Sequence, residues 1–288
     1  MKSNDSRLER EVETTSLRRQ DLLCLFFYYC GISRIRNLVF RLRRMPIVRI
    51  LAFHDVPYCQ IRCFREKLEF VQKATNVISL DDIFAGRMSL EKINIVITFD
   101  DGYRSWLDTI CPILRDLDLN ATFFISSGHI GLREHEERDF LLKNLKSNRQ
   151  SSGSLTAEGL RRLAEEGFAI GGHTCNHINM AEIDDINKLH YEVQKDKEEL
   201  ERISKTSLKY FAYPFGYHFN ANIDLVGVLK KSGYQGAVTL VPGLITAGTD
   251  SFFLHRDLVN ASMPMSAFKA RLLGNYDAVM YVRKILRI

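Results

Sequence analysis

The sequence predicts an α/β fold built on a parallel sheet or barrel, and three observations predict it. Short runs of apolar and β-branched residues alternate with helical stretches of ten or more residues, which is the order of βαβ units. Polar residues follow directly after several of these runs, where an α/β barrel carries its chemistry. The 288 residues are enough for one barrel domain with a well-buried core.

The candidate strands are short and apolar, as expected for strands buried on both faces of a parallel sheet. They lie at 47–53, 95–99, 121–125, 168–170, 208–213, 236–240 and 252–254. Helical stretches at 103–116, 156–166 and 223–231 separate several of them, and glycines follow the last two as stop signals. The charged segment 128–155 is expected to be an exposed insertion between units.

Residues 1–45 are expected to form a basic amphipathic helical arm ahead of a catalytic domain at 46–288. Within 16–44, apolar residues recur at steps of three and four with arginines around them, and Gly31 interrupts the pattern. Such a stripe is typical of a helix that lies on an anionic membrane. A helix docked on its own domain needs the same stripe, so the pattern leaves both interpretations open.

The net charge of +5 is concentrated at the N-terminus. Residues 1–50 carry eleven Lys and Arg against five Asp and Glu, so this stretch is +6 and the rest of the chain is −1. A near-neutral body offers no basic surface for nucleic acid, and no nucleic-acid partner is expected. An anionic membrane explains the charge better, so we expect peripheral membrane contact through 16–44.

Cysteine usage and hydropathy indicate the compartment. Six cysteines are scattered without a CxxC pair, which argues against a zinc ribbon or a redox motif and favours free thiols in a reducing compartment. The longest apolar run, at 22–32, is about half of what a bilayer crossing needs. We therefore expect a cytoplasmic protein with peripheral contact at the inner face of the membrane.

Unusual polar residues stand after five of the candidate strands. The sets are His54-Asp55, Asp100-Asp101, His173 with His177, Tyr213-Pro214-Phe215, and His255-Arg256. Two histidines four residues apart can aim both imidazoles at one point. One Asp with two His makes a three-ligand set for a divalent metal that leaves positions open for water and substrate. A second Asp is then free to serve as a base.

Three segments resemble motifs of the polysaccharide deacetylases, carbohydrate esterase family 4. Residues 98–102 (TFDDG) are similar to the first motif, residues 173–177 (HTCNH) to the second, H-[ST]-x-x-H, and residues 213–216 (YPFG) to the third. The resemblance spans about 47–275, most of the chain. It implies a distorted (β/α) barrel with fewer than eight regular strands.

The resemblance also implies roles for the residues of the first two motifs. Asp100 is implied as the general base, and three side chains are implied as metal ligands, namely Asp101, His173 and His177. Two imidazoles and a carboxylate suit zinc, cobalt, nickel or iron comparably. We expect one divalent ion, with zinc as the first choice.

The third motif and the general acid are less well defined. Tyr213, Pro214 and Phe215 are implied at the substrate, where the backbone N–H of Phe215 would help to hold the oxyanion. Two histidines compete to protonate the leaving amine. His54 matches an early motif of the branch that handles poly-N-acetylglucosamine, whereas His255 fits imperfectly the late Leu-x-His setting of the better-known branch. We favour His54.

This chain departs from the family pattern at two places. Phe211 stands where an Arg usually opens the third motif, and Arg256 is expected to supply the charge that orients Asp100. The acidic and tryptophan motif that usually lines the acetyl pocket is not recognisable, and the single tryptophan, Trp106, is expected in the core.

The resemblance implies a metal-dependent hydrolase that removes N-acetyl groups from an amino sugar in a polysaccharide or a lipid-linked glycan. The basic arm favours the lipid-linked substrate. Two other functions fit the same residues: hydrolysis of another amide or of an O-acetyl ester at the same metal site, and a non-catalytic barrel that binds glycans.

Overall fold

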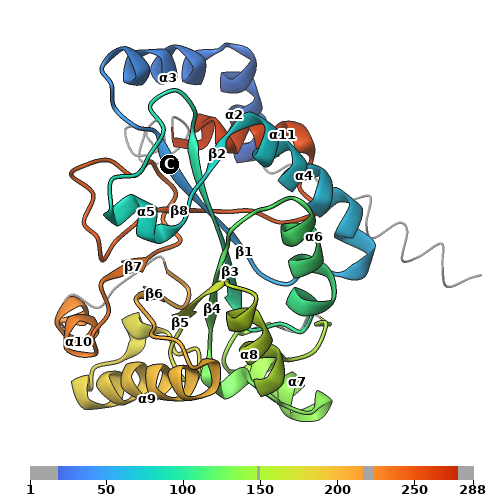
Figure 1. Cartoon of the computed structure of the whole chain (residues 1–288), viewed down its shortest axis with the longest axis vertical. Coiled ribbons are helices and arrows are strands. Elements are labelled where there is room, and N and C mark those ends of the chain that lie inside the picture. Colours follow the sequence, from blue (N-terminus) through green and yellow to red (C-terminus); the bar gives the residue numbers. More distant parts are fainter. Residues whose placement is uncertain (1–18, 148–149, 217–223, 278–288) are drawn as a thin grey trace, which may run out of the picture.

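The computed structural model describes residues 19–147, 150–216 and 224–277, and a parallel sheet forms its centre (Figure 1). Seven strands follow the order β7-β6-β5-β4-β3-β1-β8, and β2 pairs with β3 beside this path. All pairings between these strands are parallel. The strands are β1 (Val48–Phe53), β2 (Asn76–Val77), β3 (Asn94–Asp101), β4 (Thr122–Ile125), β5 (Ala169–Gly172), β6 (Tyr210–Ala212), β7 (Gly236–Val238) and β8 (Arg256–Leu258).

The sheet is nearly closed into a barrel. A parallel bridge joins Val238 of β7 to Leu254, just ahead of β8, and so brings the two ends of the sheet together. Helices surround the sheet (Figure 1), so the predicted (β/α) barrel is confirmed. They are α2 (Arg19–Tyr29), α3 (Ile32–Leu42), α4 (Ile61–Ala74), α5 (Leu80–Phe84), α6 (Cys111–Asp116), α7 (Glu134–Lys143), α8 (Ala157–Glu165), α9 (Ile186–Ser204), α10 (Leu225–Lys231) and α11 (Met265–Leu272).

Six of the seven predicted strands coincide with an observed strand, and the one predicted at 252–254 is wrong. Asp250 accepts hydrogen bonds from the backbone N–H groups of Phe252, at 2.8 Å to its side chain, and of Phe253, at 2.9 Å to its carbonyl. This local turn competes with a sheet ladder, so the strand begins only at Arg256. The expected insertion at 128–155 is also not wholly exposed, because it contributes α7 and the buried His129.

Aromatic rings fill the core beneath β3. The ring of Phe99 stacks on those of Phe53 and Phe123, with centroids 5.5 and 5.0 Å away. Trp106 is fully buried, as expected, and packs against Phe123. Its indole Nε1 donates to the backbone carbonyl of His54 at 3.3 Å, so the core also supports the chain at the end of β1.

The segment 16–44 holds two helices rather than one, although residues 16–18 lie outside the described residues. Gly31 separates α2 from α3 with φ of 74°, a left-handed conformation that glycine adopts at little cost. Helix α2 packs against α11 at the top of the view in Figure 1, and Cys24 on it is buried. Within the described ranges, we find no helix with the length and apolar character needed to cross a bilayer.

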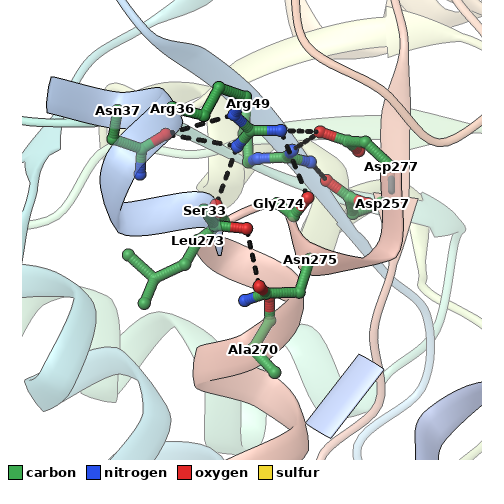
Figure 2. Close-up of polar contacts among 10 residues, drawn as sticks. All are labelled: Ser33, Arg36, Asn37, Arg49, Asp257, Ala270, Leu273, Gly274, Asn275 and Asp277. Atoms are coloured by element: carbon green, nitrogen blue, oxygen red, sulfur yellow. Dashed lines mark hydrogen bonds and ion pairs between the residues drawn. The ribbon is translucent and has the colours of Figure 1, made fainter. Parts of the chain in front are cut away.

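A buried cluster of charges ties α3, β1 and β8 to the chain after α11 (Figure 2). Arg49 is fully buried and donates to Asp257 at 2.6 Å and to Asp277. Arg36 of α3 donates to the same Asp277 carboxylate at 2.9 Å. Burial alone lowers the pKa of Arg49, but Asp257 and Asp277 outweigh it and raise this pKa above its ordinary value.

Removing the central cation of this cluster should destabilise the fold strongly. In Arg49→Met the buried Asp257 carboxylate loses its partner, so we expect the free energy of unfolding to fall by about 3–5 kcal/mol in urea titrations followed by circular dichroism. Arg62→Met removes only an exposed pair with Glu66 and serves as the control, with a change of at most about 0.5 kcal/mol. A loss below about 1 kcal/mol in Arg49→Met would contradict this assignment.

Candidate metal centre

The sheet brings the polar residues of several strands to one edge because its strands are parallel. Phe53 pairs with Phe99, so His54, the residue after β1, lies beside Asp100 near the end of β3. Asp101 pairs with Ile125, and Ile125 in turn pairs with Gly172, the residue before His173. Residues more than 100 positions apart in the sequence therefore meet at the carboxyl ends of β1, β3 and β5.

Asp101, His173 and His177 converge at this edge, and all three are buried. The Oδ1 atom of Asp101 lies 3.5 Å from Nε2 of His173 and 3.3 Å from Nε2 of His177. One donor atom from each residue lies within 4.8 Å of the other two. The loop after β5 makes this possible, since it carries both histidines back over the end of β3.

The hydrogen bonds of the two imidazoles leave the correct nitrogen free for a metal. Nδ1 of His173 lies 2.7 Å from the carbonyl oxygen of Ala212, and Nδ1 of His177 lies 3.3 Å from that of Asn144. Each Nδ1 therefore carries a proton, and Nε2 is the nitrogen that faces Asp101 and that a metal would take. Oδ1 of Asp101 is buried without a hydrogen-bond partner among the described residues. A divalent cation satisfies this oxygen and both nitrogens, so the residues fit a metal site.

Asp101 is held in the ionised form that a ligand requires. Burial by itself raises the pKa of its carboxyl group. The neighbouring His54, His173 and His177 outweigh burial and hold this pKa well below the ordinary value. A carboxylate in this position is charged at neutral pH and is available to a cation.

The second carboxylate, Asp100, is clamped by Arg256. Nη1 and Nη2 of Arg256 donate to the two oxygens of Asp100, each at 2.7 Å, and both side chains are buried. Nε of Arg256 donates to the carbonyl of Thr239 at 2.8 Å, which fixes the guanidinium plane. Burial raises the pKa of Asp100, but Arg256 and then His173 reverse the effect and lower it.

The two histidines considered as general acid lie in different surroundings. His54 follows β1 and lies beside Asp100 of the neighbouring β3, because Phe53 pairs with Phe99. His255 precedes β8 instead of following a strand, and its ring lies close to Gly243. No hydrogen bond or ion pair joins His255 to Asp100 or Asp101 in the described parts of the chain. The strand register therefore places His54 beside Asp100, whereas His255 adjoins Arg256, the residue that binds Asp100.

The three residues of the third motif also differ from one another. Tyr213 and Pro214 are buried, and the ring of Tyr213 stacks on that of Phe253 with centroids 5.9 Å apart. Phe215 is half-buried, and its ring meets that of His177 edge-on with centroids 4.8 Å apart. Only Phe215 of this motif stands beside the metal donors.

Backbone strain is concentrated at the same place. Four of the eight described non-glycine residues with positive φ belong to this edge, namely Asp101, Thr174, His177 and Phe215. Such conformations persist where the surroundings fix them, and they cluster at functional sites. The Thr174 hydroxyl helps to fix its loop by accepting the N–H of Ile178 at 3.1 Å.

Helix α9 supplies two supporting carboxylates that the sequence analysis missed. Asp196 accepts the backbone N–H of His173 and of Ser127, each at 2.8 Å. Glu192, one turn earlier, accepts the backbone N–H of Asn176 at 2.8 Å and its side-chain amide at 2.7 Å. Both acids lie on the buried face of α9 beside Leu189 and Val193. Acids within an apolar helical stripe were the signal that could have revealed them.

A second support, also missed, lies on the other side of Asp101. Nδ1 of His129 lies 3.1 Å from the Asp101 carbonyl, and Nε2 lies 3.4 Å from the Glu137 carboxylate. The ring is fully buried between Tyr103, edge-on at 5.6 Å, and Phe140, stacked at 5.1 Å. His129 thus helps to hold the strained backbone of Asp101 from behind the metal donors.

A cavity of about 450 Å³ lies elsewhere, at the amino end of β1. Its lining is mostly apolar and includes Met45, Val48, Phe84 and Ile245, with Arg44 among its polar residues. Because it opens at the opposite end of the sheet from the metal donors, it is not part of this site.

Comparison with known proteins shows which family this sequence matches. The family described as polysaccharide deacetylase matches residues 87–237, about half of the chain. The YxkH protein of Bacillus subtilis (strain 168) is 27% identical over 176 residues, 61% of this chain and 55% of that protein. The poly-β-1,6-N-acetyl-D-glucosamine N-deacetylase of Staphylococcus aureus (strain MSSA476) is 24% identical over 174 residues, 59% of this chain and 55% of the relative.

These matches span little more than half the length of the curated relatives. A solved structure extends the likeness to the fold. The Streptococcus pyogenes deacetylase PplD in complex with acetate has a TM-score of 0.62 and 17% identity, and the match covers 79% of this chain and 99% of that one.

Metal content should depend on the three converging donors and not on Asp100. We expect one divalent ion per chain in the wild type by plasma mass spectrometry after dialysis, and loss of that ion in His177→Ala, because two donors remain. Asp100→Asn is the matched control and should retain the metal, since its side chain bonds to Arg256. If His177→Ala retained a full equivalent of the divalent ion, this set of metal donors would be excluded.

Proposed function

This chain belongs to the polysaccharide deacetylase family, and we propose that it removes N-acetyl groups from an amino sugar of a glycan by metal-dependent hydrolysis. One observation carries the proposal. The buried Asp100, clamped by Arg256, lies directly beside a complete set of metal donors. A barrel that only bound glycans would have no use for this second carboxylate.

Asp101, His173 and His177 would hold the metal, and zinc is the ion we propose, although cobalt, nickel or iron also suit two imidazoles and a carboxylate. When bound, such an ion polarises an amide carbonyl and lowers the pKa of a water molecule toward neutrality. Asp196, Glu192 and His129 act indirectly by fixing the loop and strand that carry the ligands.

In the proposed reaction Asp100 is the general base. Arg256 lowers the pKa of this carboxyl group, so it is ionised at neutral pH and can accept the proton of the attacking water. Water adds to the carbonyl carbon, the C–N bond breaks, and acetate and the free amine of the sugar leave. Arg256 donates through both Nη atoms, which fixes the direction in which the carboxylate faces the water.

His54 is proposed as the general acid that protonates the leaving amine. Its place after β1 and beside Asp100 supports this choice over His255. Phe215 is proposed to donate its backbone N–H to the oxyanion. The positive φ of Phe215 and its contact with the His177 ring support that position.

The proposal extends to the class of glycan that carries the N-acetyl groups. The Staphylococcus aureus relative is named for poly-β-1,6-N-acetyl-D-glucosamine, so oligomers of N-acetylglucosamine are the first substrate to test. A lipid-linked glycan is proposed as the second substrate to test, although the metal donors lie at the opposite end of the sheet from α3. A location on the cytoplasmic side, with peripheral membrane contact through 16–44, is proposed on the basis of the basic arm.

Acetate release tests the function against its closest alternative. We expect release from N-acetylglucosamine oligomers and little from acetylated xylan, whose acetyl groups are esters. Asp100→Asn should lower kcat by about 10²- to 10⁴-fold with the metal retained, because the base is lost. Equal activity of Asp100→Asn and wild type would overturn the mechanism, and preferential release from xylan would indicate an esterase.

A pair of histidine variants should separate the two candidate acids. We expect His54→Gln to lower kcat for N-acetyl substrates by about 100-fold or more, because the amine must leave as a protonated group. For an aryl acetate, whose leaving group needs no proton, the kcat of His54→Gln should fall much less. His255→Gln is the matched control and should stay close to wild type on both substrates. The reverse ranking would assign the general acid to His255.

A further inference from the structure

Helix α3 is docked with its polar side toward the protein. Ser33 and Asn37 are buried, although both are polar, and Arg36 and Phe40 on the same side are half-buried. These four residues follow helical spacing and define one face. An amphipathic helix normally buries its aliphatic face instead.

Hydrogen bonds fix this orientation (Figure 2). The Ser33 hydroxyl donates to Oδ1 of Asn275 at 2.6 Å. Arg36 donates to the carbonyl oxygens of Leu273, at 2.8 Å, and Gly274, at 3.2 Å, besides its ion pair with Asp277. A side chain at Gly274 would meet the Arg36 guanidinium at 2.2 Å, so glycine is required for this approach. Rotating α3 about its axis would break every one of these bonds.

The aliphatic face of α3 consequently points to solvent. Ile35, Leu38, Val39 and Leu42 are 66%, 55%, 41% and 75% exposed. They repeat the spacing of the buried face, displaced by half a turn, and so form a continuous stripe. We call these four residues the aliphatic stripe. An exposed contiguous stripe of this kind marks an interaction surface.

Arginines flank the stripe on both sides. Arg34, Arg41, Arg43 and Arg44 are exposed, and in the described parts of the chain none of them has an ion-pair partner. The sequence contains no Asp or Glu between Asp21 and Asp55. The surface that complements this face must therefore be apolar within and anionic at its boundary.

We propose that the aliphatic stripe and its four arginines dock this protein on the surface of an anionic phospholipid membrane, with α3 lying in the plane of the interface. The aliphatic side chains would enter the acyl boundary, and the arginines would pair with phosphate groups. A second copy of the chain is less suitable as the partner, because a symmetric contact through the stripe would bring eight arginines together.

Docking in this way leaves the metal centre in water. Helix α3 ends close to the first residue of β1, whereas the metal donors are the last residue of β3 and two residues that follow β5. The six residues of β1 span roughly 20 Å, so the two features lie at opposite ends of the sheet. The inference is independent of the proposed activity, since binding to vesicles is measured without substrate.

Flotation of the full-length protein with vesicles tests the proposal. We expect it to float with vesicles in which about a third of the lipid is phosphatidylglycerol and to remain behind with pure phosphatidylcholine, with binding weakened by salt. Combined Leu38→Gln and Leu42→Gln should lower the partition coefficient by about tenfold or more. Combined Arg34→Gln, Arg41→Gln and Arg43→Gln should remove the preference for anionic vesicles.

Two controls make the outcome decisive. Combined Leu90→Gln and Leu142→Gln changes two exposed leucines outside α3 and should bind like wild type. Thermal unfolding should show that all variants keep their fold, because the substituted side chains are exposed. Wild type that fails to float with anionic vesicles, or a stripe variant that floats equally well, overturns the proposal. A wild-type dimer that the stripe variant dissociates, with no vesicle binding by either, would also overturn it.

Discussion

The buried ion pair between Arg256 and Asp100 connects the last strand of the barrel to its centre. Arg256 belongs to β8, and Asp100 belongs to β3, with β1 between them. Two charges can remain inside a core only where both are fully hydrogen-bonded, and here the guanidinium reaches both carboxylate oxygens and the Thr239 carbonyl. The same bonds that make this pair tolerable in the core also orient the carboxylate that faces the metal donors. The same contacts of Arg256 therefore help to hold β8 in the barrel and to place the proposed base.

The metal donors are held in position by groups that are not metal ligands themselves. Helix α9 holds the loop of His173 through Asp196 and Glu192, and His129 holds the backbone of Asp101 from the other side. This support offsets the strain of several positive φ angles at the site. A second buried arginine, Arg49, plays a comparable structural part at the opposite end, where it joins β1 to Asp257 of β8 and to Asp277, which also binds Arg36 of α3. One end of the sheet carries the chemistry, and the other presents the aliphatic stripe.

Much of the fold and of the site could be predicted from the sequence, for identifiable reasons. Strand runs such as 95–99 are apolar because both faces of the sheet are covered, and this pattern is local. Asp100, Asp101, His173 and His177 could be selected because their residue types and spacings fit one chemistry. The predicted strand at 252–254 failed because the side chain of Asp250 forms a turn there. Tyr213 was assigned to the substrate from its place in a motif, and the structure adds that its ring is buried against that of Phe253.

The sequence by itself determined the α/β class, the barrel, the candidate donors and the concentration of charge in the arm. The family resemblance pointed to Arg256 as the partner of Asp100, but only the tertiary structure showed the two-fold contact between them and brought Asp196 and Glu192 to the loop of His173. The tertiary structure also decided which face of α3 is buried, since periodicity defines two opposite faces but not the direction in which each points. The partners on that face, Asn275 and Asp277, lie more than 230 residues away. Such pairings depend on strand register and on the surroundings of each buried charge, and neither is encoded in local sequence.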